Sequence, residues 1–491
     1  MTRALVAEKA KCVRVGFALG FVLPGLVAAQ TRPAAPLHAC MVAALPTLTT
    51  LCATVLVPEN RTSAGGRMLE LRVVVVPPDS AGPELEPIVP VPGGPGGGTI
   101  DGGNGWVRIL KAARAHRTLI LHDPRGTGNS GALACDFTDG PGRPGSYIHD
   151  FAPPQKVKAC AAELSQRTDL TKYTTDAVAA DLADILTRLG YRSANLYGVS
   201  GGTRQAFIFA QRYPDRVRTL ILGGVVPPGF KLPLHYAQDF ERAFGLLATD
   251  CDHDALCHAA YPNIRKEFAA LLARLDHEPA RVPVPRAGPV PDTAIITRGI
   301  FVERIRTMLY SQFLSPTVPF VVHQAARGDF GPFVSSQVPP PGGAMPPDGV
   351  AMGHYLAVTC SEDLDRIGPV ERSAAAAGTS LGDYRVQQQM DACRLWPHAK
   401  LPEAHFAFKV LPVPTLLISG DADPVTPPRQ AEAIKQYLPR ARHVVFPTGW
   451  HVPLGTPCAA DIATRFILAG DAASLDFSCA ASLRRPPFKL P

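Results

Sequence analysis

Ser200 lies at the centre of a short pattern that places a nucleophile between a strand and a helix. It is the middle residue of the G-x-S-x-G pentapeptide 198–202, with an apolar run over 194–197 before it and a helical run over 203–213 after it. Glycines allow a sharp turn that holds the serine Oγ clear of the backbone. The pattern predicts a nucleophile elbow. In a chain with 43 glycines it also arises by chance, so the assignment depends on partner residues.

Two aspartates follow a second strand-like segment and compete for the role of the acid. The apolar run over 413–419 predicts a buried parallel strand, and it leads directly into the loop 420–427. Asp421 follows the strand too closely to reach an imidazole. Asp423 lies further along, directly before Pro424, in a loop that can reach one. We therefore assign Asp423 as the acid.

His451 completes a triad. It follows the last predicted strand, 443–446, after a turn that contains Gly449, and it alone of the fourteen histidines has this setting. The order serine, aspartate, histidine along the chain is the order in which α/β-hydrolases carry their triad. The sequence therefore predicts an α/β-hydrolase fold with Ser200 as nucleophile, Asp423 as acid and His451 as base.

Acyl transfer also needs backbone donors aimed at the oxyanion. One is the amide of Gly201, the residue after the nucleophile. The second is expected from the glycine-rich loop 92–98, which follows the apolar run 88–91, and we assign it to Gly94. A flexible loop or a phosphate cradle is the alternative, but no Lys-Ser/Thr follows as a P-loop requires.

The segment 123–128 carries a carboxylate and an arginine at a strand end, where a catalytic role has to be considered. We favour a structural role. Arg125 can bond loop carbonyls and support the oxyanion loop, while the two glycines of the segment allow the turn.

Taken together, these motifs resemble the secreted serine exopeptidases related to proline iminopeptidase, especially the tripeptidyl-aminopeptidase-like branch. The matching stretches are 93–96, 123–130, 173–175, 198–203, 420–427 and 449–451. In that family the aspartate three residues after the glycine of the acid loop is catalytic, which agrees with Asp423. The chain departs from the family at Pro92, where iminopeptidases usually have histidine, and at Gly201, where an aromatic residue usually follows the serine and narrows the pocket.

The order of predicted elements indicates a hydrolase core interrupted by a cap. An opening hairpin over 54–57 and 69–76 precedes strands at 88–91, 118–122, 194–197 and 217–222, with a helix over 175–189. Helix-like segments at 236–249, 263–275 and 299–312 then separate these strands from the last two predicted strands. We expect a mostly parallel sheet and a mainly helical cap, divided as signal peptide 1–29, core 30–228, cap 229–409 and core 410–491.

The N-terminus predicts export. Four basic residues precede the apolar run 15–27, and small residues up to Ala29 form a cleavage pattern. A membrane anchor is the alternative, but a run of about thirteen residues is shorter than the roughly twenty that a span needs. We expect a secreted or periplasmic protein, cleaved near Ala29, with no stable membrane anchor.

Cleavage would remove Cys12 and leave ten cysteines, an even number that favours disulfides in an oxidising compartment. Sequence does not fix their connectivity. Pairing of nearest neighbours gives Cys40–Cys52, Cys135–Cys160, Cys251–Cys257, Cys360–Cys393 and Cys458–Cys479. The alternative, a metal site, lacks any C-x-x-C spacing, so neither a metal nor a cofactor is implied.

The net charge of +7 does not indicate a nucleic-acid partner, because no long basic run carries it. We expect peptide substrates; the oligomeric state stays open. The function predicted is a serine aminopeptidase that cleaves short peptides from free N-termini. Such an enzyme needs a carboxylate for the substrate α-ammonium group, and Glu362 and Glu303, both in the predicted cap, are the candidates. A carboxylesterase or lipase with the same triad is the first rival, and a non-catalytic binding protein on this fold is the second.

Overall fold

A computed structural model describes residues 35–491, except 64, 84, 140–142, 285–291 and 339–349. The predicted signal peptide, 1–29, lies outside the described residues.

The centre of the fold is a nine-stranded sheet in the order β1-β2-β3-β5-β4-β6-β7-β10-β11. The strands β4, β5, β6, β7, β10 and β11 pair in parallel, whereas β1, β2, β3 and β5 pair antiparallel. The bounds are β1 (His38–Cys40), β2 (Thr50–Pro58), β3 (Met68–Val76), β4 (Ile88–Val91), β5 (Leu119–His122), β6 (Ala194–Val199), β7 (Val217–Gly223), β10 (Thr415–Gly420) and β11 (Ala441–Phe446). The predicted strands are all present, and the predicted α/β-hydrolase fold with a mostly parallel sheet is confirmed.

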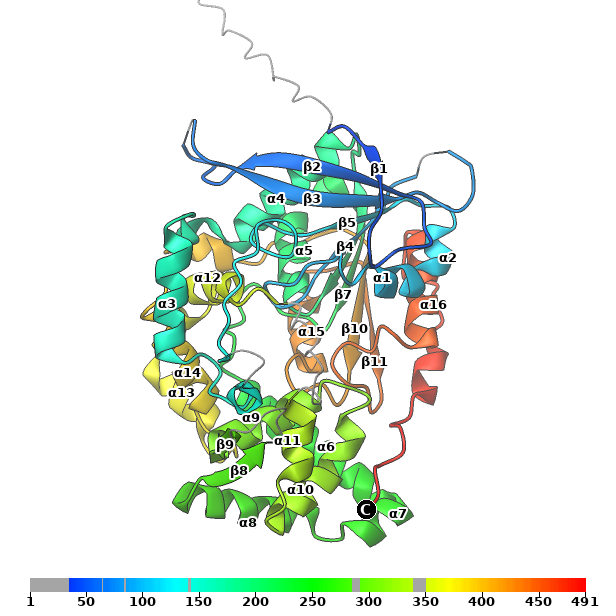
Figure 1. Cartoon of the computed structure of the whole chain (residues 1–491). Coiled ribbons are helices and arrows are strands. Elements are labelled where there is room, and N and C mark those ends of the chain that lie inside the picture. The colour runs from blue at the N-terminus through cyan, green and yellow to red at the C-terminus, as the bar shows by residue number, and fades with distance from the viewer. Residues whose placement is uncertain (1–34, 64, 84, 140–142, 285–291, 339–349) are drawn as a thin grey trace, which may run out of the picture. The chain divides into compact units, whose positions relative to one another are not determined.

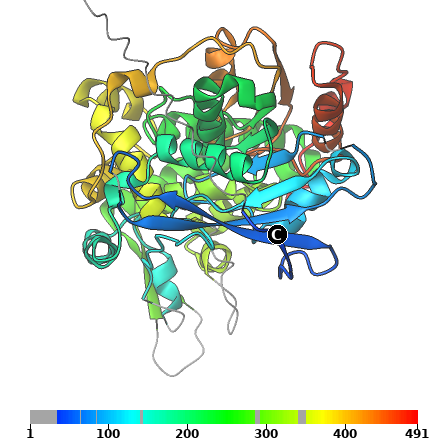
Figure 2. The ribbon, with the colours of Figure 1, turned by 90° about the horizontal axis from the view of Figure 1, so that it is seen from above.

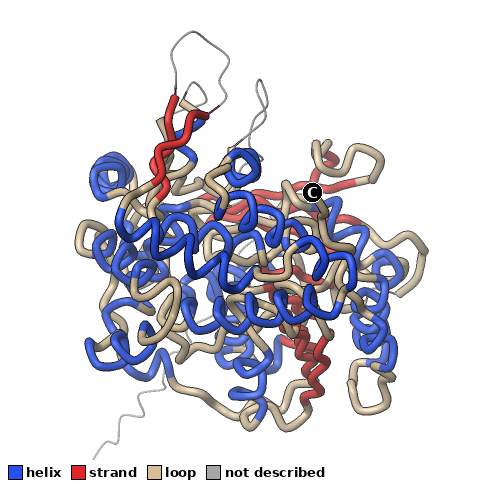
Figure 3. Tube along the Cα trace, turned by 90° about the horizontal axis from the view of Figure 1, so that it is seen from below, coloured by secondary structure: helices blue, strands red, loops and turns tan. Residues whose placement is uncertain are grey.

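Alternate side chains of the strands enter two different hydrophobic cores, as the two-residue period of a strand requires. In β3, Val73 and Val75 pack into one core with α4 and α5, while Val74 and Val76 pack into the other with α2 and α16. Figure 3 shows helices on both sides of the red strands. The helices of these layers and their connections are α1 (Gly103–Ile109), α2 (Lys111–Arg114), α3 (Pro154–Ser165), α4 (Thr175–Arg188), α5 (Gly201–Arg212), α15 (Pro428–Lys435) and α16 (Pro457–Ala469).

Nine further helices separate β7 from β10 along the described chain. They are α6 (Tyr236–His253), α7 (Ala255–Ala260), α8 (Ile264–His277), α9 (Arg298–Met308), α10 (Val318–Ala326), α11 (Gly331–Gln337), α12 (Met352–Glu362), α13 (Pro369–Ala376) and α14 (Tyr384–Cys393). A two-stranded antiparallel sheet, β8 (Ala280–Val284) and β9 (Asp292–Ile296), joins them and stands apart from the main sheet in Figure 3. Phenylalanines of α6, α8, α9 and α11 form a core of their own.

The proposed boundaries of the cap fall in loops. The cut after 228 lies between β7 and α6, and the cut after 409 lies between α14 and β10. Figure 1 shows α6, α8, α9, α10 and α11 grouped below the sheet, and Figure 2 shows the yellow helices α13 and α14 on the opposite side of the view from the red α16. The division of the chain at these two points remains our proposal.

Five disulfides are formed, and they join the pairs that nearest-neighbour order predicts. Their Cα–Cα distances lie between 5.1 and 5.8 Å, within the usual range for a disulfide. Cys360–Cys393 ties α12 to α14, and Cys458–Cys479 ties α16 to the C-terminal segment. Across the described ranges, no helix combines the length and apolar character that a membrane crossing needs.

Candidate active site

The candidate site lies at one edge of the sheet because its parts follow parallel strands. The loop 92–98 follows β4, Ser200 follows β6, Asp423 follows β10 and His451 follows β11. Parallel strands all end at the same edge, so residues that are far apart in sequence meet there.

Ser200 occupies the turn between β6, which ends at Val199, and α5, which begins at Gly201. Its φ is 51°, a left-handed conformation that residues with a side chain seldom adopt. A Cβ on Gly202 would collide with the carbonyl oxygen of Pro92, so only glycine lets α5 approach the loop after β4 this closely. The local backbone is therefore that of a nucleophile elbow, with a partly exposed serine.

The structure brings the three predicted triad residues into one hydrogen-bonded chain. His451 Nε2 lies 3.0 Å from Ser200 Oγ, and His451 Nδ1 lies 2.7 Å from Asp423 Oδ2. When Nδ1–H donates to the carboxylate, Nε2 is left with the lone pair that can accept the serine proton. This arrangement can deprotonate Ser200 for attack on a carbonyl carbon.

Asp423 is fully buried, and several donors hold it in the charged form. Its Oδ1 accepts from the amides of Val425 (2.8 Å) and Thr426 (2.9 Å), and its Oδ2 accepts from the Thr426 hydroxyl at 2.7 Å. Burial alone would raise the pKa of Asp423, but His451 and these donors outweigh burial and lower the pKa. The carboxylate therefore stays negative beside the imidazole.

The two aspartates of the acid loop differ in surroundings, and a threonine joins the site. The Asp421 side chain is 45% exposed, and its nearest cationic partner is Arg242 at 3.4 Å. The Thr426 hydroxyl lies 3.1 Å from His451 Nδ1 as well as bonding Asp423. Sequence reasoning missed Thr426, although its place three residues after the acid was a usable signal.

Gly94 and Gly201, the predicted oxyanion donors, lie against each other. Gly94 has a φ of 116°, and a Cβ on Gly201 would lie 2.7 Å from the Gly94 carbonyl oxygen. Gly201 also begins α5, whose positive N-terminal end favours negative charge. Within the described part of the chain, neither amide has an assigned acceptor. The placement suits donors that await a ligand oxygen, and the oxyanion role remains a proposal.

Asp123 braces the segment that follows the oxyanion loop. Its buried Oδ1 accepts from the amides of Thr99 (3.0 Å) and Ile100 (3.2 Å), and its Oδ2 accepts from the amide of Asn129 at 2.8 Å. Sequence reasoning gave this supporting role to Arg125, whereas the bracing contacts come from Asp123.

Arg125 has a structural role deeper in the core. It is fully buried, bonds both carboxylate oxygens of Asp181 (2.6 and 2.7 Å), and donates to the carbonyls of Glu59 (2.9 Å) and Lys172 (3.0 Å). The bonds to loop carbonyls agree with the structural role predicted for it.

Glu362 is buried among internal partners. Its carboxylate accepts from the amide (2.7 Å) and hydroxyl (2.8 Å) of Thr175 and from Arg204 at 3.4 Å, while His405 lies 3.7 Å away. Burial would raise the pKa of Glu362, but His405 and Arg204 outweigh burial and lower it to about 2. A carboxylate that is already satisfied in this way is poorly placed to receive a substrate ammonium group.

Glu303 is also occupied. Its two oxygens bond Arg306 at 2.6 and 2.9 Å, and Oε1 bonds Arg385 at 2.5 Å. The residue is 6% exposed, and the two guanidinium groups outweigh the effect of burial and lower its pKa to about 2. The structure therefore does not favour the predicted ammonium-binding role for either glutamate.

A second serine shows that hydrogen-bond geometry alone does not make an active site. Ser419 Oγ lies 2.9 Å from His443 Nε2, and His443 Nδ1 lies 2.6 Å from Glu432 Oε1. Ser419 lies within β10 and is fully buried, so a substrate cannot reach it. Partial exposure and a helix N-terminus distinguish Ser200.

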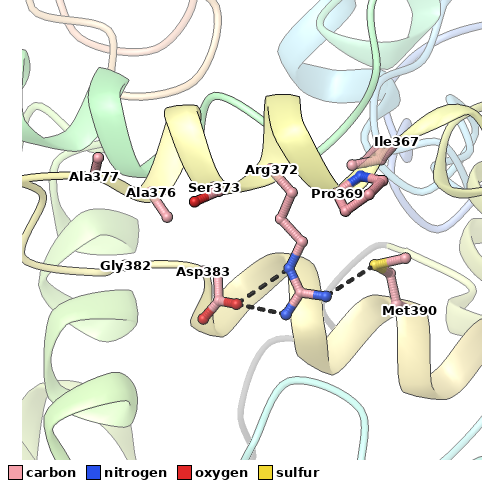
Figure 4. Close-up of a pocket in the computed structure, with 9 residues that line it drawn as sticks. All are labelled: Ile367, Pro369, Arg372, Ser373, Ala376, Ala377, Gly382, Asp383 and Met390. Atoms are coloured by element: carbon pink, nitrogen blue, oxygen red, sulfur yellow. Dashed lines mark hydrogen bonds and ion pairs between the residues drawn. The ribbon is translucent and has the colours of Figure 1, made fainter.

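A surface pocket between α13 and α14 lies apart from these residues. Figure 4 shows Arg372 reaching across it to Asp383 and towards Met390. Its lining includes none of the predicted site residues.

Comparison with known families agrees with this geometry. The chain matches the family described as alpha/beta hydrolase fold over residues 86–268, which include Ser200. It matches the family described as TAP-like protein over residues 378–479, which include Asp423 and His451. The chain belongs to the α/β-hydrolase superfamily. The predicted resemblance to its tripeptidyl-aminopeptidase-like members is confirmed.

Individual relatives of this hydrolase are distant but extend over most of the chain. It is 25% identical to serine protease Hip1 of Mycobacterium tuberculosis over 461 residues, which span 86% of this chain and 85% of Hip1. It is 26% identical to tripeptidyl aminopeptidase of Streptomyces lividans over 465 residues, 87% of this chain and 83% of that protein. Carboxylesterase B of M. tuberculosis is 24% identical over 474 residues, 88% and 86% of the two chains. The predicted placement among the serine peptidases of the superfamily is confirmed.

Proposed function

We propose that this hydrolase is an exported serine aminopeptidase that releases short peptides from free N-termini. The observation that carries the catalytic part is the hydrogen-bonded chain from Ser200 through His451 to Asp423, with links of 3.0 and 2.7 Å. The peptide substrate is supported by the relatives named as a serine protease and a tripeptidyl aminopeptidase.

In this mechanism His451 Nε2 takes the Ser200 proton as Oγ attacks the scissile carbonyl carbon. The carbonyl oxygen becomes an oxyanion that faces the amides of Gly94 and Gly201. Asp423 stabilises the imidazolium, which then gives its proton to the leaving amine as the C–N bond breaks. An ester between the acyl group and Ser200 remains.

Water completes the cycle. His451 removes a proton from water as the water oxygen attacks the acyl carbon, and it returns that proton to Ser200 Oγ when the ester bond breaks. The released product is the acid form of the N-terminal fragment.

Export is the second part of the proposal. The five disulfides support it, because such bonds persist in oxidising compartments. The basic and apolar leader in residues 1–29 supports it from the sequence.

A carboxylesterase is the second candidate. Two observations favour it: a relative named carboxylesterase B, and the internal pairing of both glutamates proposed for the ammonium group. The chemistry at Ser200 is the same for an ester.

The test compares one tripeptide p-nitroanilide with a free α-amino group, its N-acetylated form, and p-nitrophenyl butyrate, with Ser200→Ala as the blank. We expect kcat/KM for the free peptide to exceed that for the acetylated peptide by at least about tenfold, a difference of about 1.4 kcal/mol in transition-state binding. Equal turnover of the two peptides, or turnover of the ester alone, would replace the aminopeptidase by the esterase.

A further inference from the structure

Tyr310 is the aromatic residue that lies against the catalytic imidazole. The ring centres of Tyr310 and His451 are 4.8 Å apart, with 63° between the ring planes. Tyr310 follows the end of α9 at Met308, in the helical region between β7 and β10, whereas His451 follows β11. A residue of the proposed cap therefore contacts the base of the triad.

The phenol oxygen of Tyr310 accepts a hydrogen bond from an arginine that belongs to a buried ion pair. Arg306 Nη1 donates to the phenol oxygen at 2.8 Å, and Arg306 in turn bonds both oxygens of Glu303. Arg306 is only 2% exposed. Glu303 and Arg306 lie three residues apart on one face of α9, and Tyr310, four residues after Arg306, continues this row beyond the end of the helix towards the triad.

Two other helices fix the position of that row. Arg385 of α14 bonds Glu303 at 2.5 Å, and the Arg306 guanidinium lies 4.5 Å from the ring centre of Tyr236 in α6. The ion pair therefore has little freedom to move, and the phenol that it holds is fixed as well.

Tyr310 also packs beside the acid loop. It joins an apolar cluster that includes Tyr236, Val226 and Val425. The Val425 amide donates to Asp423 at 2.8 Å, so one tyrosine borders both the base and the loop that carries the acid.

We infer that Tyr310 is a positioning residue for His451. An imidazole rotates easily about its Cβ–Cγ bond, yet the triad needs Nε2 towards Ser200 and Nδ1 towards Asp423 at the same time. A ring packed 4.8 Å away restricts that rotation, and catalytic groups need orientation within about 10–20°. Glu303 then serves as the anchor of Arg306. The inference rests on the triad of the proposed function and is independent of the peptide specificity.

The experiment uses p-nitrophenyl acetate, whose acyl group is too small to depend on distant substrate contacts. We expect Tyr310→Ala to lower kcat by about 10–100-fold with KM within about twofold, since a small misplacement of a catalytic group has effects of this size. Tyr310→Phe keeps the ring and should stay within about threefold of wild type. Phe313→Ala is the matched control, because Phe313 lies in the same segment and is 76% exposed.

Thermal unfolding of each variant separates positioning from misfolding, and Tyr310→Leu is measured in place of Tyr310→Ala if the alanine variant does not fold. An unchanged kcat for the folded variant, or a rise in KM alone, would overturn the inference. Ester turnover that survives in Ser200→Ala would instead refute the proposed triad. A wild-type protein that turns over the ester but not the peptide would refute only the aminopeptidase activity.

Discussion

Replacing Glu362 by glutamine tests whether this carboxylate holds the fold together or binds substrate. The carboxylate is 1% exposed and bridges α12 to Thr175 at the start of α4 and to Arg204 in the nucleophile helix α5. Glutamine preserves the shape and one acceptor oxygen but removes the charge. We expect Glu362→Gln to destabilise the protein.

The size of this destabilisation follows from the lowered pKa of Glu362 and from the loss of its buried ion pair. The pKa of Glu362 falls from an ordinary 4.5 to about 2 on folding, which corresponds to about 3 kcal/mol at neutral pH. Breaking a buried ion pair by removing one partner costs about 3–5 kcal/mol. Glutamine still accepts from Thr175, and Arg204 keeps its bonds to Asp363 at 2.9 and 3.2 Å, so about 2–3 kcal/mol is expected.

The assay is denaturant unfolding across pH of wild type, Glu362→Gln and the control Glu163→Gln, which changes an exposed glutamate of α3. Because folding lowers the pKa of Glu362, its stabilisation is present above pH 4.5 and is lost as the pH falls towards 2. The difference between wild type and Glu362→Gln should shrink in that window, while Glu163→Gln should match wild type throughout. Unchanged stability of Glu362→Gln, together with a higher KM for free-amine peptides only, would refute this reasoning.

Two further predictions concern Thr426, which bonds Asp423, and His405, which lies beside Glu362. Thr426→Val removes a hydrogen bond to the buried Asp423, and such a bond to a charged acceptor is worth about 1.5–3 kcal/mol. We therefore expect Thr426→Val to lower kcat about 10–100-fold and Thr426→Ser to retain most activity. Equal kcat for both variants would contradict the role of the hydroxyl. Burial alone would lower the pKa of His405, but Asp176 and Glu362 outweigh burial and raise it to about 9. The stabilisation of the fold by charged His405 is therefore complete below pH 6.5 and is lost as the pH rises through about 9. The unfolding midpoints of wild type and His405→Gln should converge over that range. A constant difference between the two midpoints would argue against a charged His405.

The triad was predictable because each member has a local signal. Ser200 and Asp423 follow the buried strands β6 and β10, His451 follows the partly exposed edge strand β11, and parallel strands bring their ends to one edge of the sheet. Each loop could therefore be assigned separately, and the fold then supplied the contact between them. The disulfide pairs were predictable for a similar reason, because each bridge closes a short stretch of chain.

The surroundings of Glu362 and Glu303 were not predictable from the sequence. The partners of Glu362 are distant in sequence, and the three-residue spacing of Glu303 and Arg306 is also typical of an exposed pair on a helix. Thr175 lies 187 residues before Glu362, and no local pattern links them. Glu303 and Arg306 look like a solvated pair on a helix surface, yet packing of α6 and α14 around α9 buries both. The predicted helix 299–312 also ends early, at Met308, and Tyr310, just beyond its end, lies against His451.

The most direct test of the central claim is covalent labelling of the folded protein with a fluorophosphonate, followed by mass mapping of the adduct. A serine activated by His451 and Asp423 should give one adduct, on Ser200. Labelling should disappear in Ser200→Ala and persist in Ser419→Ala, since Ser419 has similar hydrogen bonds but is fully buried. An adduct that maps to another serine, or a folded wild-type protein that resists labelling, would contradict the assignment of Ser200 as the nucleophile.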